Sequence, residues 1–141
     1  MGTLKILLLI LLTPLVSCSQ NNRDYFGNIT DVTIPASAIV TREEHNKMGP
    51  GYAKVLEVNL DADATNRLLI SIEKSHYYKN IEPILTRSGP KPLIQYGQYK
   101  GLWYRQKNGY VFFGTTLNDR DVITATFDPT KKKATFGIFA D

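Results

Sequence analysis

Residue types that could carry acid–base, nucleophilic or metal chemistry gather at two places, Ser75-His76 and Glu43-Glu44-His45. A serine hydrolase needs an activated serine on a strained turn, a histidine, and a third group that orients the histidine. The chain has no Gly-x-Ser-x-Gly motif, and Ser75 falls at the end of a predicted helix, where serine is common for structural reasons. We therefore predict no catalytic residue and no enzymatic activity, and we interpret both histidines as surface residues.

Metal and cofactor sites are not predicted either. His45 and His76 lack a His-x-x-x-His spacing, and the single cysteine excludes a cysteine-rich zinc site and an internal disulfide. Neither Gly49-Pro50-Gly51 nor the pair Gly97 and Gly101 leads from a strand into a helix with a following lysine, as a phosphate loop does. We expect no metal and no cofactor.

The charge of the chain is only mildly basic. Its 141 residues carry a formal net charge of +4, which does not indicate nucleic-acid binding. The basic run Lys131-Lys132-Lys133 lies at the tip of a predicted hairpin and is typical of a solvated turn that protects a sheet edge from aggregation. The alternative for this run is contact with anionic head groups or lipopolysaccharide phosphates.

The first 18 residues predict export. Lys5 is followed by the apolar run Ile6–Leu12, which is too short to span a bilayer and is typical of a secretory signal. The run ends in Leu15-Val16-Ser17-Cys18, which resembles the lipobox of bacterial lipoproteins. The resemblance implies cleavage between Ser17 and Cys18, a diacylglyceryl group on the Cys18 thiol, and acylation of the new amino terminus. An ordinary signal with an incidental Cys18 is the alternative, but it would leave an unpaired thiol in an oxidising compartment.

Such an anchor predicts a place in the cell envelope. Each buried CH₂ contributes roughly 0.8 kcal/mol, so two or three acyl chains on Cys18 would hold the protein on a membrane. Cys18 is followed by Ser19 rather than aspartate, which resembles Gram-negative lipoproteins passed on to the outer membrane rather than kept at the inner one. We predict a signal peptide over residues 1–17, a flexible lipidated tether over 18–24, and one domain over 25–141.

The remaining pattern predicts an α+β domain, mostly an antiparallel sheet with one helix packed on a face. A first strand is predicted over residues 29–34, and the alternation of Tyr52–Leu60 predicts a better one. A helix is predicted from about Asp63 to Ser75, with Asp61 or Asp63 as its cap and an apolar stripe along one side.

A C-terminal meander is predicted from two turn signals. Asn108-Gly109 is typical of a two-residue type I′ turn, which pairs Arg105 with Phe112 and Trp103 with Gly114. The second turn, Asp128-Pro129-Thr130-Lys131, joins two alternating runs and pairs Ala125 with Ala134. The first hairpin then shares one face among Trp103, Arg105, Tyr110 and Phe112. The second has an apolar face formed by Ile123, Ala125, Phe127, Ala134, Phe136 and Ile138.

The segment from His76 to Gly101 has no regular pattern and is rich in tyrosine. We expect a short helix near Asn80–Leu85 or a short strand near Leu93–Tyr96. Tyrosine and tryptophan dominate binding hot spots, because they bury a large area for few rotatable bonds. The alternative is that these aromatic residues belong to the core. The predicted partner-contact residues are Tyr77, Tyr78, Tyr96, Tyr99, Trp103 and Tyr110.

One wider resemblance covers the mature region. The layout begins with Ile34-Pro35-x-Ser37-Ala38, continues through the Leu68-Leu69 helix and Trp103, and ends in the Gly109-Tyr110 and Asp128-Pro129-Thr130 hairpins. It is similar to that of small exported bacterial lipoproteins of unknown function, and it implies no activity. The sequence thus predicts a membrane-anchored, non-enzymatic module that binds a protein partner, in the manner of an immunity or inhibitor protein. The alternatives are a structural or assembly accessory of an envelope complex and a small envelope hydrolase.

Overall fold

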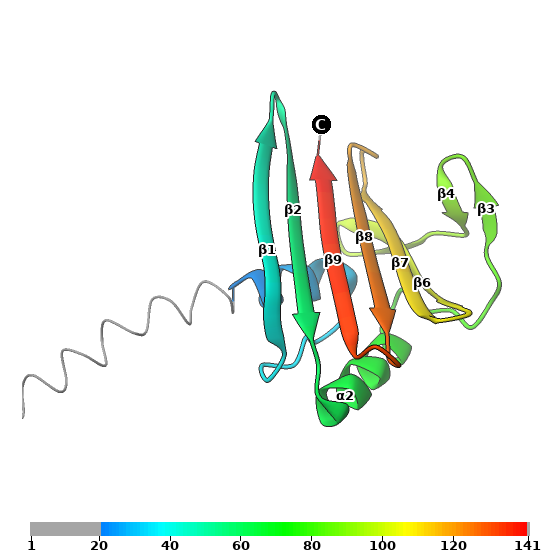
Figure 1. Cartoon of the computed structure of the whole chain (residues 1–141). Coiled ribbons are helices and arrows are strands. Elements are labelled where there is room, and N and C mark those ends of the chain that lie inside the picture. The colour runs from blue at the N-terminus through cyan, green and yellow to red at the C-terminus, as the bar shows by residue number, and fades with distance from the viewer. Residues whose placement is uncertain (1–20, 141) are drawn as a thin grey trace, which may run out of the picture.

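The computed structural model describes residues 21–140, and its centre is a seven-stranded antiparallel sheet (Figure 1). The strand order is β1-β2-β9-β8-β7-β6-β5, so each sheet neighbour except β2–β9 is also a neighbour in the sequence of strands. A small separate hairpin of β3 and β4 projects beyond the β6 side. The predicted α+β, mostly antiparallel class is confirmed. The strands are β1 (Ile39–Met48), β2 (Gly51–Asn59), β3 (Ile84–Thr86), β4 (Gly89–Lys91), β5 (Ile94–Tyr96), β6 (Tyr99–Gln106), β7 (Gly109–Thr116), β8 (Asp121–Asp128) and β9 (Lys133–Ala140).

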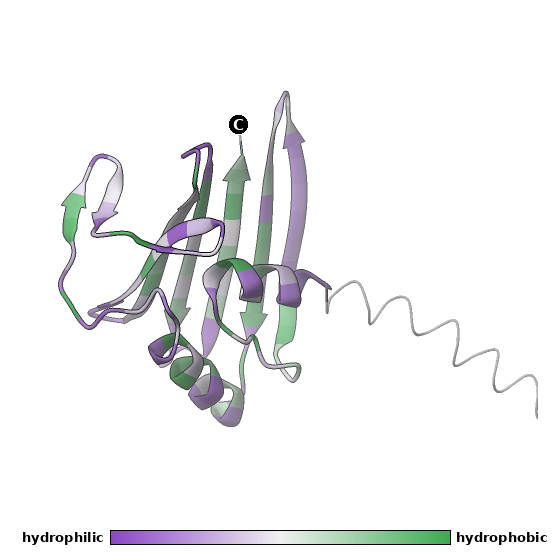
Figure 2. Cartoon of the chain, turned by 180° about the vertical axis from the view of Figure 1, so that it is seen from behind, coloured by the Kyte–Doolittle hydropathy of each residue, from purple (hydrophilic) through white to green (hydrophobic). Residues whose placement is uncertain are grey.

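Two helices lie on the same face of the sheet (Figure 2). The helix α2 (Ala62–Glu73) begins at Asp61, whose side chain accepts a hydrogen bond from the Ala64 backbone N–H at 2.7 Å. Its predicted stripe is buried against the sheet, which confirms the helix and identifies Asp61 as the cap. The other helix comprises residues 21–30 of the described chain. Buried residues of both helices meet those of the sheet in one core, which includes Phe26, Ile29, Leu68, Ile72, Leu56, Phe112, Ile123 and Phe136.

The start of the domain differs from the prediction. Residues 29–34 contain no strand, because Ile29 and Thr30 belong to the helix, which ends where Asp31 takes a left-handed φ of 55°. Phe26 and Ile29 lie three residues apart on one buried face of this helix. The sequence after residue 29 alternates loosely between apolar and polar residues, and this alternation favoured a strand over the helical spacing. Residues 21–24, predicted as tether, are helical as well, and the Arg23 guanidinium donates to the Ala38 carbonyl at 2.6 Å.

No strand was predicted for residues 41–47, which form the polar part of β1. Residues 41–47 are all exposed and mostly charged, because β1 is the edge of the sheet. Charged side chains are a usual protection of such an edge, and they remove the alternation by which a strand is recognised. An edge strand of this kind is therefore hidden from pattern analysis.

Both C-terminal hairpins form, but in a different register from the predicted one. The strands β6 and β7 pair Trp103 with Phe112 and Arg105 with Tyr110, so the turn is Lys107-Asn108 and not Asn108-Gly109. The cause lies at Gly109, where a Cβ would sit 2.0 Å from the Phe127 carbonyl oxygen of β8. The glycine is thus required inside the strand, where two backbones approach closely, rather than in the turn.

The second hairpin shows the same kind of shift. Ala125 pairs with Phe136 rather than Ala134, and the four-residue loop 129–132 contains Lys132 at a left-handed φ of 53°. In both hairpins the pairing moves by two residues, which keeps every side chain on its predicted face because the strand period is two. The predicted apolar face of the second hairpin is buried throughout.

The irregular segment becomes an edge of the sheet in two short pieces. Residues 94–96 form β5, which confirms the second of the two alternatives, and the predicted helix near Asn80–Leu85 is absent. Upstream, the Trp103 backbone N–H donates to the Tyr77 carbonyl at 2.8 Å, and the Lys79 N–H donates to the Trp103 carbonyl at 3.2 Å. The segment between these two attachments carries the β3–β4 hairpin.

Candidate functional site

Three of the six predicted contact residues are core residues. Tyr77, Trp103 and Tyr110 are each no more than 5% exposed, so the prediction that they contact a partner is wrong. The alternative, that Trp103 packs in the core, is confirmed: its ring lies 5.2 Å from that of Phe112. Sequence reasoning placed them in or beside an irregular segment, but the two helices cover this face of the sheet, and Trp103 contacts Thr30 of the first helix while Tyr110 contacts Glu73 of α2 (Figure 2).

The polar atoms of these three residues join the layers of the domain. The Trp103 indole N–H donates to the Thr30 carbonyl at 2.8 Å, and the Tyr77 hydroxyl donates to the Tyr96 carbonyl at 2.7 Å. The Tyr110 hydroxyl donates to the Glu73 carboxylate at 2.8 Å. Burial raises the pKa of Tyr77 to about 12, and burial together with Glu73 raises the pKa of Tyr110 to about 12. Their role is structural.

The other three predicted contact residues keep some accessible surface. Tyr78 and Tyr99 are half-buried against the core, and burial raises the pKa of Tyr99. Tyr96 is exposed, and its ring stacks on the His76 ring with 3.9 Å between centroids. Tyr96 is therefore the predicted residue that remains best placed to meet a partner.

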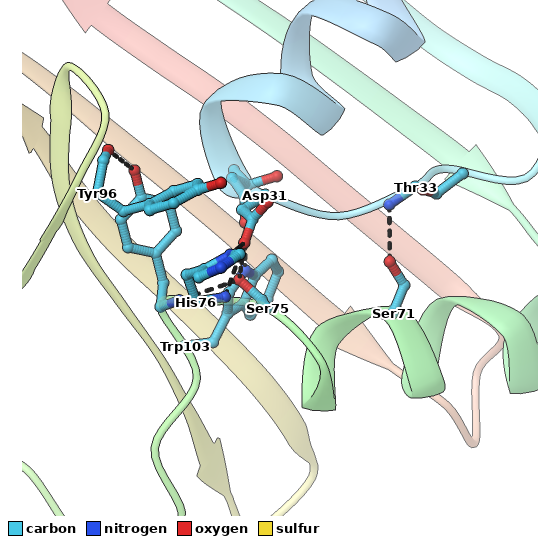
Figure 3. Close-up of polar contacts among 9 residues, drawn as sticks. Asp31, Thr33, Ser71, Ser75, His76, Tyr96 and Trp103 are labelled. Carbon is cyan, nitrogen blue, oxygen red and sulfur yellow. Dashed lines mark hydrogen bonds and ion pairs between the residues drawn. The ribbon is translucent and has the colours of Figure 1, made fainter.

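The close-up in Figure 3 shows a polar cluster that brings Asp31 to Ser75 and His76. One carboxylate oxygen of Asp31 accepts hydrogen bonds from the Ser75 hydroxyl at 3.2 Å and from the His76 backbone N–H at 2.7 Å. The His76 Nδ1 lies 2.9 Å from the same oxygen, and the ring is held against Tyr96. Nearby, the Thr33 N–H donates to the Ser71 hydroxyl at 2.8 Å.

This cluster contains the three residue types of a serine hydrolase in a different geometry. In a catalytic triad the serine hydroxyl donates to the histidine, and the histidine in turn donates to the carboxylate. Here the hydroxyl of the buried Ser75 donates directly to Asp31 and accepts from the Tyr77 N–H at 3.2 Å. The carboxylate thereby ties the loop after the first helix to the end of α2, which is a positioning role for the fold.

Among the large aliphatic side chains of the described residues, the two with the highest exposed fraction lie on the β3–β4 hairpin. Ile84 is 72% exposed and Leu85 is 70% exposed. Successive strand residues point to opposite sides, so neither side of β3 is covered by the domain. The hairpin is fixed beside its turn, because Pro90 is buried and Gly89, which pairs with Thr86 next to the turn, leaves no room for a Cβ beside the Phe113 ring, which would lie 2.5 Å away. The hairpin is thus held against β7 near its turn, while Ile84 and Leu85 on β3 remain exposed.

A groove of about 510 Å³ runs beside this hairpin. Ile81, Pro83 and Leu85 line one side of it, and Tyr104 of β6 lines the other. The sequence analysis missed the hairpin, although Pro83 and Gly89 bracket a short apolar run as a strand signal does. Exposure of both faces cannot be inferred from that run, because it depends on where the hairpin lies in the tertiary structure.

The predicted lipidation and cleavage residues, Cys18 and Ser17, lie outside the described residues. Within residues 21–140, no helix has the length and apolar character needed to cross a membrane. The same residues contain no group of three or more histidine, cysteine, aspartate or glutamate side chains placed to hold a metal ion.

The geometry therefore offers two surface features for function. One is the exposed pair Ile84 and Leu85 on β3 with the groove beside it, and the other is the stack of Tyr96 on His76. Comparison of the chain with protein-family models, curated proteins and solved structures finds no match.

Proposed function

We propose that this protein is a lipid-anchored, non-enzymatic binding module of the bacterial cell envelope that contacts a protein partner through the β3–β4 hairpin. The observation that carries the proposal is the exposure of Ile84 and Leu85 on an element that is fixed beside its turn. Full burial of an aliphatic side chain contributes roughly 1.5–3 kcal/mol, so covering both would contribute substantially to affinity. A fixed hairpin also loses little conformational freedom on binding.

The direction of the hairpin supports a protein partner over the protein's own membrane. Residue 21 begins the described chain at the β1 edge, where the Asn22 amide donates to the Glu43 carboxylate. Cys18 is three residues before residue 21, so the Cα atoms of these two residues can be at most about 11 Å apart. The hairpin projects past β6, on the opposite side of the sheet (Figure 1). With adjacent strands about 4.8 Å apart, the two edges of the seven-stranded sheet are separated by roughly 29 Å.

Matched substitutions test this function. The protein is tagged, cross-linked in the cells that make it, and purified with its bound partners. The double variant Ile84→Ser, Leu85→Ser should lose a partner that the wild type recovers, with an affinity loss of tenfold or more once that partner is purified. Ile39→Ser is the control, because Ile39 on β1 is 68% exposed and lies at the other edge. Recovery of the same proteins by all three forms would contradict the proposal.

A further inference from the structure

The excess positive charge of the described chain is confined to two hairpin tips. Residues 21–140 contain 16 basic and 12 acidic side chains, and the tip segments 105–109 and 128–133 contain five of the basic ones and one acidic one, Asp128. The rest of the described chain therefore has 11 of each and is neutral overall. The five basic residues are Arg105, Lys107, Lys131, Lys132 and Lys133.

A cavity of about 350 Å³ lies between these tips. We name it the tip cavity; Val111, Thr126 and Thr135 form its wall on the sheet face away from the helices, where they alternate with core residues. Gly109 and Asp128 line it too.

Three lysines line the tip cavity: Lys107 from the first tip, and Lys131 and Lys133 from the second. Lys133 also reaches Glu57 at 3.3 Å. Lys107 and Lys131 form no ion pair within residues 21–140. The acid on the rim, Asp128, is engaged by its own turn, because one oxygen accepts from the Thr130 and Lys131 backbone N–H groups at 3.0 Å each. These amide hydrogen bonds leave the Asp128 carboxylate charged, so with Lys133 paired to Glu57 the ammonium groups of Lys107 and Lys131 exceed it and the cavity is positively charged.

We propose that the tip cavity binds a phosphate group. Lysine ammonium groups bind phosphate as compact point charges, and several of them together suit a group that carries more than one negative charge. The negative charge of a phosphate group suits the ammonium groups of Lys107 and Lys131, which exceed the charge of Asp128, and its several oxygens can accept hydrogen bonds from the hydroxyls of Thr126 and Thr135. The phosphate could belong to a soluble phosphorylated molecule or to a lipid head group. This site is separate from the β3–β4 hairpin and does not depend on the protein-binding function.

Titration of the purified protein with inorganic pyrophosphate, followed by amide NMR shifts, tests the proposal. Shifts should concentrate in residues 106–111 and 126–135, and Lys131→Gln should weaken binding about tenfold. Lys91→Gln is the control, because Lys91 is an exposed lysine on β4, away from the tips; it should change affinity less than twofold. Shifts spread over lysines throughout the chain, or equal affinities for the two variants, would overturn the proposal.

A second arm distinguishes the two sources of phosphate. The wild type and Lys131→Gln are compared for their preference for vesicles containing phosphatidic acid over vesicles of phosphatidylcholine alone, which cancels any contribution of a lipid anchor. Loss of this preference in Lys131→Gln assigns a lipid head group as the ligand. An unchanged preference, together with weakened pyrophosphate binding, assigns a soluble phosphorylated ligand. Thermal melting of both lysine variants checks that they remain folded.

Discussion

Replacing Gly109 with alanine tests the hairpin register on which the core and the tip cavity depend. The new Cβ would lie 2.0 Å from the Phe127 carbonyl oxygen, and the φ of +151° is itself unfavourable for an L side chain. The atom that the new Cβ meets belongs to the backbone of a paired strand, which cannot change its rotamer as a side chain can. The strands β7 and β8 would therefore have to separate locally. Backbone strain of about 1–3 kcal/mol and overpacking of about 1–3 kcal/mol together predict a loss of about 4 kcal/mol in the free energy of unfolding.

Gly97→Ala provides the matched control. Gly97 has a φ of +61° with no atom within 4 Å of a built Cβ, so alanine there adds conformational strain of only about 1–2 kcal/mol. Urea unfolding can be followed by the fluorescence of Trp103, the single tryptophan, which is fully buried. Similar small losses for both variants would show that Gly109 occupies an open turn, as the Asn108-Gly109 type I′ register requires, and would refute the observed pairing.

Three further predictions concern the aromatic core and the anchor. Tyr77→Ala should lose about 3–5 kcal/mol of stability, and Tyr96→Ala should lose far less, as measured by thermal melting; equal losses would contradict their different burial. The pKa of Tyr110 is raised from 10.0 to about 12, so the stability it contributes is complete below pH 10 and is lost as the pH rises to 12. Tyr110→Phe should therefore flatten the alkaline fall in stability across pH 10–12, and an unchanged slope would refute this linkage. Cys18→Ser should abolish lipid labelling and leave the precursor uncut, whereas normal processing would exclude the lipobox.

Pattern analysis predicts most of the sheet and the helix α2, because their periodicity is caused by burial on one face. Leu56 and Val58 alternate with partly exposed residues, and Leu68 and Ile72 recur at helical spacing. Side-chain faces in both C-terminal hairpins were predicted while their registers were wrong, since a shift of two residues leaves the faces unchanged. The close contact of Gly109 with Phe127 set the register, and that contact joins residues 18 positions apart.

The exposed residues of the candidate site were harder to predict from the sequence than the sheet and the helix. A tyrosine in an irregular segment has the same composition signal whether it is buried, as Tyr77 is, or exposed, as Tyr96 is. Ile84 and Leu85 resemble core residues in the sequence, and their exposure depends on where the β3–β4 hairpin lies beyond β6 (Figure 1). The clustering of Lys107 with Lys131 likewise arises only when two hairpin tips meet.

Photo-cross-linking at position 85 tests the central claim most directly. A photoreactive amino acid is placed at Leu85 in the full-length protein and, in a separate strain, at Ile39, which is similarly exposed at the opposite edge of the sheet. Irradiation of living cells should give a discrete protein adduct from position 85 that is absent from position 39. An adduct of the same kind from both positions, or from position 39 alone, would contradict the proposal that the β3–β4 hairpin is the contact surface.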